Sequence, residues 1–92
     1  MSTSLFELGK IALTQGIVDL PAFASIDTVK ALLNRHSSGD WGDMDPEDCR
    51  ANTMALKYGY RLMSAYTIDD QKIWVITESD RSVTTLLLPD EY

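Results

Sequence analysis

The sequence predicts an α+β domain in which helices pack on one face of an antiparallel sheet. Three observations indicate this class. The chain has 92 residues, which suits a single domain over residues 1–92. Apolar side chains recur at helical spacing between residues 25 and 58, and at the shorter period of strands between residues 60 and 88. Glycine, proline and aspartate separate these segments, which gives the expected order β-α-α-β-β-β.

The N-terminal part is expected to contain one strand and one helix. The strand is placed at residues 8–14, where Ile11 and Leu13 share one face. The helix follows, and either Ser25 or Asp27 can cap its first turn. Its buried stripe is predicted to consist of four apolar residues at helical spacing, namely Ile26, Val29, Leu32 and Leu33.

The second helix carries the stronger start signal. Asp45 is placed as its N-cap and Pro46 as its first residue. Glu47 and Asp48 then supply negative charge to the first turn, where the helix dipole favours it. Gly59 ends the helix at a position where a left-handed residue is usual. One face is predicted to be buried, and it is formed by Ala51, Met54, Ala55 and Tyr58.

Three strands are expected to form a meander in the C-terminal part. They are placed at residues 60–68, 72–78 and 82–88, and the polar turns DDQ and SDR join them. Trp74 and Ile76 lie on one face of the middle strand, and apolar residues also occupy the other face. A strand that is apolar on both faces is expected at the centre of a sheet.

The composition excludes several classes of partner. Fourteen acidic and eight basic residues give a net charge of −6. Phosphate binding needs clustered Lys and Arg, so free nucleic acid and anionic membranes are not expected partners. An acidic face suits a protein partner with a basic groove. Cys49 is expected to be a cytosolic thiol, and no signal peptide or membrane-spanning run is recognised.

The stretch RHSSGDWGDMDPEDCRAN, residues 35–52, is the densest in chemical groups. It holds the only histidine, the only cysteine, one of two tryptophans and five carboxylates. A zinc site is not expected, because structural zinc prefers four Cys or His ligands. The acids fail the calcium-loop pattern, since Asp48 stands where glycine is needed and Met54 where glutamate is needed. No metal and no cofactor is therefore expected. Turns and a helix N-terminus account for the acids.

Three residues keep two interpretations open. His36 is either a hydrogen-bonded structural residue or an acid–base group that needs a partner such as Asp40 or Asp43. Trp41 either folds onto the core as a lid or forms an exposed anchor for a partner, since tryptophan is enriched at binding hot spots. Arg81, in a hairpin turn, either pairs with a carboxylate of the same chain or contacts an anion or a partner.

Two motif blocks carry a resemblance to a known family. The blocks are RHSSGDWGD with ED and AN just after it, and RLMSAY, WVITESDRS and TTLLLPDEY further on. Over residues 5–92 the chain resembles small accessory proteins carried by bacterial plasmids, integrative elements and prophages. Ser79 and Cys49 depart from the family pattern, in which alanine and a charged residue are usual. The resemblance implies no catalytic roles; the matching positions are Arg35, His36, Gly39, Asp40, Trp41, Gly42, Asp43, Arg61, Trp74, Glu78, Asp80 and Arg81.

The main functional hypothesis rests on this resemblance and on the acidity. By size and context, such a protein is similar to anti-CRISPR and anti-restriction proteins. We expect a cytoplasmic, non-enzymatic inhibitor of a host defence complex, most concretely an anti-CRISPR protein that blocks target DNA through an acidic surface. A monomer or weak dimer is expected. The predicted partner-binding residues are Asp40, Trp41, Asp43, Asp45, Glu47, Asp48 and Arg81.

Two alternatives remain. The first is a small hydrolase or nuclease-like enzyme that uses His36 with Asp40 or Asp43. In that enzyme Arg81 would hold an oxyanion or a phosphate. The second is a regulatory partner of another protein of the same mobile element.

Overall fold

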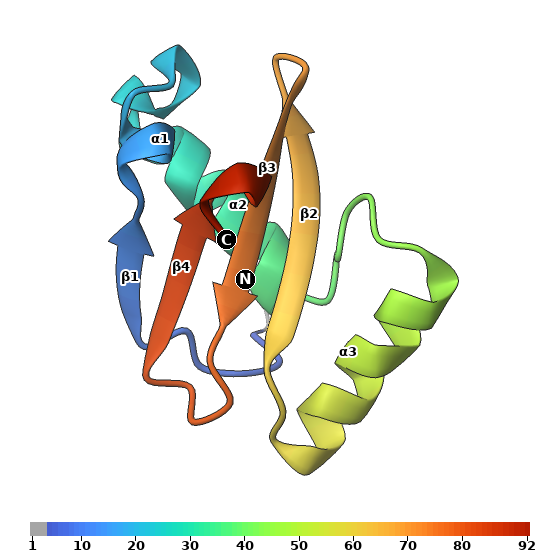
Figure 1. The fold of residues 1–92 in the computed structure, drawn as a ribbon. Coiled ribbons are helices and arrows are strands. Elements are labelled where there is room, and N and C mark those ends of the chain that lie inside the picture. The colour runs from blue at the N-terminus through green and yellow to red at the C-terminus, as the bar shows by residue number, and fades with distance from the viewer. Residues whose placement is uncertain (1–3) are drawn as a thin grey trace.

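In the part of the chain that the structure describes, four strands, three helices and two 3-10 turns form the α+β fold that the sequence predicts (Figure 1). The computed structural model describes residues 4–92. In chain order the elements are β1 (Lys10–Leu13), α1 (Gln15–Val18), η1 (Pro21–Ala24), α2 (Ile26–Ser37), α3 (Pro46–Tyr58), β2 (Leu62–Ile68), β3 (Gln71–Thr77), β4 (Val83–Leu87) and η2 (Pro89–Glu91).

The sheet is mixed, which corrects the prediction of an antiparallel sheet. Its strand order is β1-β4-β3-β2, and β2, β3 and β4 form the expected antiparallel meander. β1 pairs with β4 in parallel, with Lys10 beside Val83 and Leu13 beside Leu86. Residue patterns indicate that a strand exists but not its direction, and the long helical connection after β1 frees it from hairpin pairing.

The core lies between the sheet and α2. Ser25 caps this helix, since its hydroxyl accepts a hydrogen bond from the backbone N–H of Asp27 (3.2 Å). Ile26 does not join the buried stripe, because 61% of its surface is exposed at the first helical position. His36 takes a buried place one turn beyond Leu32 instead. The buried residues of this core are Ile17, Phe23, Val29, Leu32, Tyr66, Ile73, Val75 and Leu86.

Helix α3 lies beside the outer edge of β2, as Figure 1 shows. Its predicted ends are confirmed, because Asp45 is the N-cap and Gly59 ends it in the left-handed region (φ 76°). Its buried face differs from the predicted one. Met54 and Tyr58 are about half exposed, at 49% and 52%, whereas Asn52 is buried. A peripheral helix needs only a narrow buried stripe, so apolar spacing alone did not identify its inner side.

Two segments complete the edge of β2. The Asn52 carboxamide donates to the carbonyl of Met63 (2.7 Å) and accepts from its N–H (3.1 Å). Gly42 forms a parallel bridge with Ala65, so the predicted loop extends the sheet for one residue. A Cβ at Gly42 would lie 2.0 Å from the Ala65 carbonyl oxygen, and φ is +74° there, so only glycine fits.

Candidate partner-binding site

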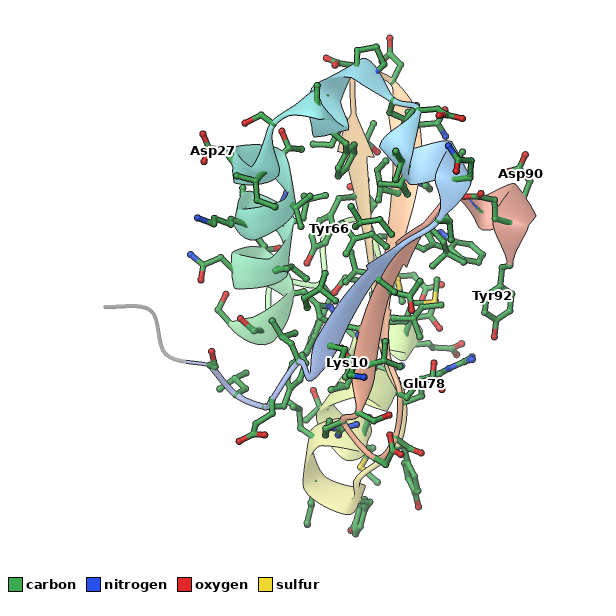
Figure 2. All side chains as sticks on the ribbon, turned by 90° about the vertical axis from the view of Figure 1, so that its left-hand side faces the viewer. Lys10, Asp27, Tyr66, Glu78, Asp90 and Tyr92 are labelled. Carbon is green, nitrogen blue, oxygen red and sulfur yellow. The ribbon has the colours of Figure 1, made fainter. Side chains whose placement is uncertain are left out.

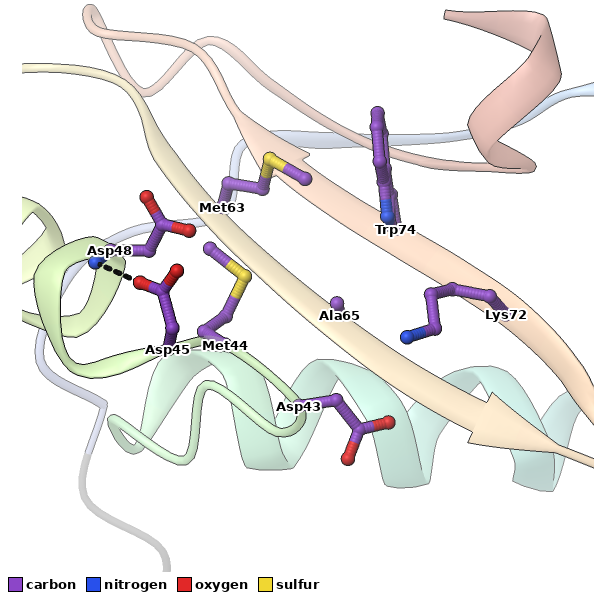
Figure 3. A pocket seen from close by; sticks show the side chains of 8 residues that line it. All are labelled: Asp43, Met44, Asp45, Asp48, Met63, Ala65, Lys72 and Trp74. Carbon is purple, nitrogen blue, oxygen red and sulfur yellow. Dashed lines mark hydrogen bonds between the residues drawn. The ribbon is translucent and has the colours of Figure 1, made fainter.

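An acid-rimmed groove opens on the face of the sheet opposite α2. It has a volume of about 340 Å³ and lies between the segment before α3 and strands β2 and β3 (Figure 3). Asp45 and Asp48 stand at one end, and Lys72 and Trp74 stand at the other. The lining residues are Asp43, Met44, Asp45, Asp48, Met63, Ala65, Lys72 and Trp74. We call this surface the acidic groove.

Three of the predicted acids meet in the acidic groove, and local structure fixes two of them. Asp45 accepts a hydrogen bond from the backbone N–H of Asp48 (2.9 Å) as the N-cap of α3. Asp43 accepts a hydrogen bond from the hydroxyl of Thr67 (2.7 Å). Asp48 projects from the first turn of α3 into the groove. Glu47 occupies the same turn and is exposed, but it does not line the groove.

The floor of the acidic groove was not predicted as part of a site. Met44, Met63 and Trp74 supply its apolar surface, and Lys72 is its only cation. Pairing of Ala65 with Trp74 brings β2 and β3 together here. The sequence did place Trp74 and Ile76 on one strand face, and that face points away from α2; Trp74 lines the groove, whereas Ile76 is buried. The sequence does not reveal that Met44 and Met63 lie beside Trp74, because this requires the strand register.

Asp40 lies outside the acidic groove and holds the loop after α2. Its carboxylate accepts from Arg35 Nε (2.7 Å) and from the backbone N–H of Gly42 (3.2 Å). The hydrogen bond from Arg35 lowers the pKa of Asp40. Tyr66 donates to the Asp40 carbonyl (2.6 Å), and the Arg35 guanidinium lies 4.4 Å from the Tyr66 ring centre. Both charged side chains are about half exposed, so the pair itself adds at most about 1 kcal/mol.

Trp41 lies in the core, so its predicted role as a packing anchor for a partner is wrong. Only 9% of its surface is exposed. It packs in a second cluster with Ala55 and Leu62, which ties α3 to the sheet. Its ring also approaches that of His36 edge-on, with 5.8 Å between ring centres. The lid interpretation is the one that the structure supports.

Arg81 has a structural role that neither interpretation foresaw. Its guanidinium donates to the carbonyls of Tyr60 (2.6 Å), Ala55 (3.1 Å), Glu78 (3.2 Å) and Ser79 (3.3 Å). Two of these contacts, to Ala55 and Tyr60, lie at the C-terminal end of α3, where the Ala55 carbonyl also accepts from the backbone N–H groups of Gly59 (2.9 Å) and Tyr60 (3.1 Å). Arg81 therefore joins the β3–β4 turn to α3, and its donors are not aimed at an anion or a partner. This corrects the prediction that Arg81 belongs to the partner-binding site.

His36 belongs to a buried chain of hydroxyls on the α2 side of the sheet. It is fully buried, and its Nδ1 lies 2.5 Å from Ser64 Oγ. Its Nε2 lies 2.9 Å from Thr77 Oγ1, which lies 2.7 Å from Thr84 Oγ1. The Thr84 hydroxyl donates to the carbonyl of Leu8 (2.7 Å).

This chain determines which nitrogen of His36 carries the proton. The Thr84 hydroxyl has one proton and donates it to the Leu8 carbonyl. Thr77 must therefore donate to Thr84. His36 Nε2–H must then donate to Thr77, and Nδ1 accepts from Ser64. Burial lowers the pKa of His36 to about 4, so the ring is neutral at pH 7.

The geometry required by the hydrolase alternative is not formed within residues 4–92. Both ring nitrogens of His36 are taken by hydroxyls, while Asp40 pairs with Arg35 and Arg81 binds carbonyls. In the same part of the chain, no group of three or more His, Cys, Asp or Glu side chains is arranged to hold a metal ion. None of the helices described is long and apolar enough to cross a membrane.

No protein-family model matches the chain, and no curated protein or solved structure shows significant similarity to it.

Proposed function

We propose that the protein is a non-enzymatic binding protein whose acidic groove takes a basic segment of a protein partner. The observation that carries this proposal is the combination of Asp43, Asp45 and Asp48 with an apolar floor that contains Met63 and Trp74. Methionine and tryptophan are enriched in the cores of protein interfaces, where acids are normally depleted. Acids placed around such a floor select a partner of opposite charge.

Lysine and arginine side chains match both parts of this surface. Their aliphatic stems cover apolar surface while their charged ends remain at the rim, within reach of carboxylates. An arginine can also lie over the Trp74 ring, which is partly exposed. Each exposed ion pair contributes about 0.2–1 kcal/mol. Useful affinity therefore requires several pairs together with burial of the floor.

The most concrete form of the proposal is an inhibitor of a host defence complex in the bacterial cytoplasm. CRISPR surveillance complexes hold nucleic acid in positively charged channels. A domain of net charge −6 with an acidic groove resembles the charge, though not the shape, of that nucleic acid. By occupying the channel, the protein would block target DNA without any chemical step.

The groove itself is tested with a matched pair of charge reversals. Asp48→Lys changes the groove, and Asp27→Lys changes the first turn of α2 on the other side of the molecule (Figure 2). Each replaces an exposed acid in the first turn of a helix, so their effects on stability should be similar. The probe is a basic amphipathic peptide, with an acidic peptide of equal length as control, and NMR shift changes report binding.

We expect the basic peptide to shift the signals of Met63 and Trp74, and Asp48→Lys to weaken its binding at least about tenfold at low salt. Asp27→Lys should bind as the original protein does. Equal binding by both variants, or equal binding of both peptides, would contradict the proposal.

The defence-inhibitor form is tested separately in cells. A plasmid that an active CRISPR system targets is introduced with and without expression of the protein. Recovery of transformants by the original protein and by Asp27→Lys, but not by Asp48→Lys, is the expected result. No recovery against the tested defence systems, together with a working groove in solution, would reject this form and retain the binding function.

A further inference from the structure

Within residues 4–92, the outer edge of β1 has no partner strand, whereas Gly42 and Asn52 cover part of the edge of β2. β1 bonds to β4 through the N–H groups of Lys10 (3.0 Å, to Ser82) and Thr14 (3.1 Å, to Leu86). Backbone groups alternate in direction along a strand, so those of Ile11 and Leu13 point away from the sheet. Within residues 4–92, β1 pairs only with β4.

Apolar side chains accompany these outward backbone groups. Ile11 is 42% exposed and Leu13 is 36% exposed, and Val18 just beyond them is 52% exposed. Figure 2 views the molecule from this side, and β1 lies nearest the viewer with α2 on one side and η2 on the other. An apolar edge strand with free backbone groups is a template for another strand.

We propose that β1 pairs antiparallel with β1 of a second copy of this chain, about a two-fold axis at Ala12. This register sets Ile11 opposite Leu13 of the partner subunit, and Leu13 opposite the partner subunit's Ile11. All the outward backbone groups of these residues then form hydrogen bonds across the axis. The two sheets become one continuous sheet, and the apolar side chains of both edges form one strip.

Charge complementarity identifies the occupant as a second copy. The register sets Lys10 opposite Thr14 of the partner subunit, on the side of the sheet where η2 lies. Glu91 accepts a hydrogen bond from the Thr14 hydroxyl (2.6 Å) and from the backbone N–H of Gly16 (3.0 Å). The carboxylate is therefore held at the place that the second copy's Lys10 reaches, and symmetry forms this contact twice.

Within residues 4–92, Lys10 forms no ion pair, since the one ion pair there joins Arg35 and Asp40. The acidic groove lies at the opposite edge of the sheet, beyond β3. Two copies joined through β1 therefore keep their most acidic surfaces apart, and both grooves stay open. An unrelated acidic or neutral strand would lack the Lys10–Glu91 match.

A designed disulfide tests the register. Ala12→Cys in a Cys49→Ser background sets the two new thiols opposite each other at a Cα separation of roughly 4.5 Å, within the range for a disulfide. Ile11→Cys in the same background is the matched control, because its thiols would lie diagonally at about 7–8 Å. We expect mild oxidation to link Ala12→Cys into dimers and to leave Ile11→Cys largely unlinked. The reverse pattern, or linkage of neither, overturns the proposal.

Sedimentation equilibrium of the unmodified protein gives an independent test. We expect reversible dimers with a dissociation constant below about 1 mM. Ile11→Lys with Leu13→Lys should yield single copies, and Lys10→Glu should weaken the dimer at least about tenfold by facing Glu91. Met54→Lys, at a side chain of similar exposure on α3, is the control and should dimerise normally. Single copies at every concentration, or dimers that survive the paired lysines, overturn the proposal.

Discussion

The two faces of the sheet use polar side chains in opposite ways. On the α2 side, four buried polar side chains are joined by hydrogen bonds, namely His36, Ser64, Thr77 and Thr84. On the other side, the acids of the groove face solvent, and only part of their hydrogen-bonding capacity is used. His36 and Asp43 are seven positions apart in the chain. The fold thus separates a structural polar cluster from a surface able to bind a ligand.

Replacing His36 in the buried polar cluster should cause the largest loss of stability. His36→Ala leaves a cavity and deprives Ser64 and Thr77 of buried partners. We expect the free energy of unfolding to fall by about 3–5 kcal/mol. Arg35→Ala, one position earlier and on the exposed side of α2, should cost at most about 1 kcal/mol. Chemical denaturation measures both, and a similar small loss for the two variants would show that the chain of hydroxyls contributes little.

Lowering the pH should cause the next largest loss of stability. The pKa of His36 is lowered from 6.5 to about 4, so the unfolded chain binds a proton more readily than the folded one. Stability from this source is complete above pH 6.5 and is lost as the pH falls towards 4. The loss is of the order of 3 kcal/mol.

The histidine is the only one in the chain, which makes this prediction easy to check. Its ring signals should titrate with a midpoint near pH 4, and the nitrogen shifts at pH 7 should show the proton on Nε2. A midpoint near the ordinary value of about 6.5 would mean that the ring is accessible to water.

Asp45 allows the structural and binding roles of one acid to be separated. Asp45→Ala removes the N-cap of α3 and should lower stability by about 1 kcal/mol. Asp45→Asn keeps a good cap and removes the charge, so stability should be nearly unchanged while binding of a basic peptide weakens. Thermal unfolding and peptide titration of the two variants test this. Equal stability of both would show that the cap is dispensable.

Lys72 should give the smallest change in stability. Its side chain is exposed and is the only cation in the acidic groove. Lys72→Ala should leave the free energy of unfolding within about 0.5 kcal/mol. Binding of a basic peptide should become tighter, because a like charge is removed. Weaker binding would contradict the assignment of the groove to a cationic ligand.

Local signals of the sequence predicted the element types well. The caps at Ser25 and Asp45 and the stop at Gly59 are confirmed, because each depends on a few adjacent residues. The direction of β1 and the buried side of α3 were wrong, because both depend on contacts with distant segments.

The same distinction holds for the candidate site. Proximity in the chain grouped Asp40, Trp41 and Asp43, yet they form an ion pair, a core residue and a groove residue. Arg81 was misplaced because a positive charge in a turn does not reveal that its partners are carbonyls. No local pattern indicates such a contact, since Ala55 is 26 positions away.

The pairing of β1 with β4 also affects how the chain folds during synthesis. Thr84 contacts the carbonyl of Leu8, 76 positions earlier, so β1 cannot dock until almost the whole domain has left the ribosome. Until then Ile11 and Leu13 remain exposed on a strand without any neighbour. Contacts this distant in sequence slow folding and prolong exposure to aggregation. Of the four strands described, β1 therefore finds its partner only after β4 has been made, and chaperones can bind it during that interval.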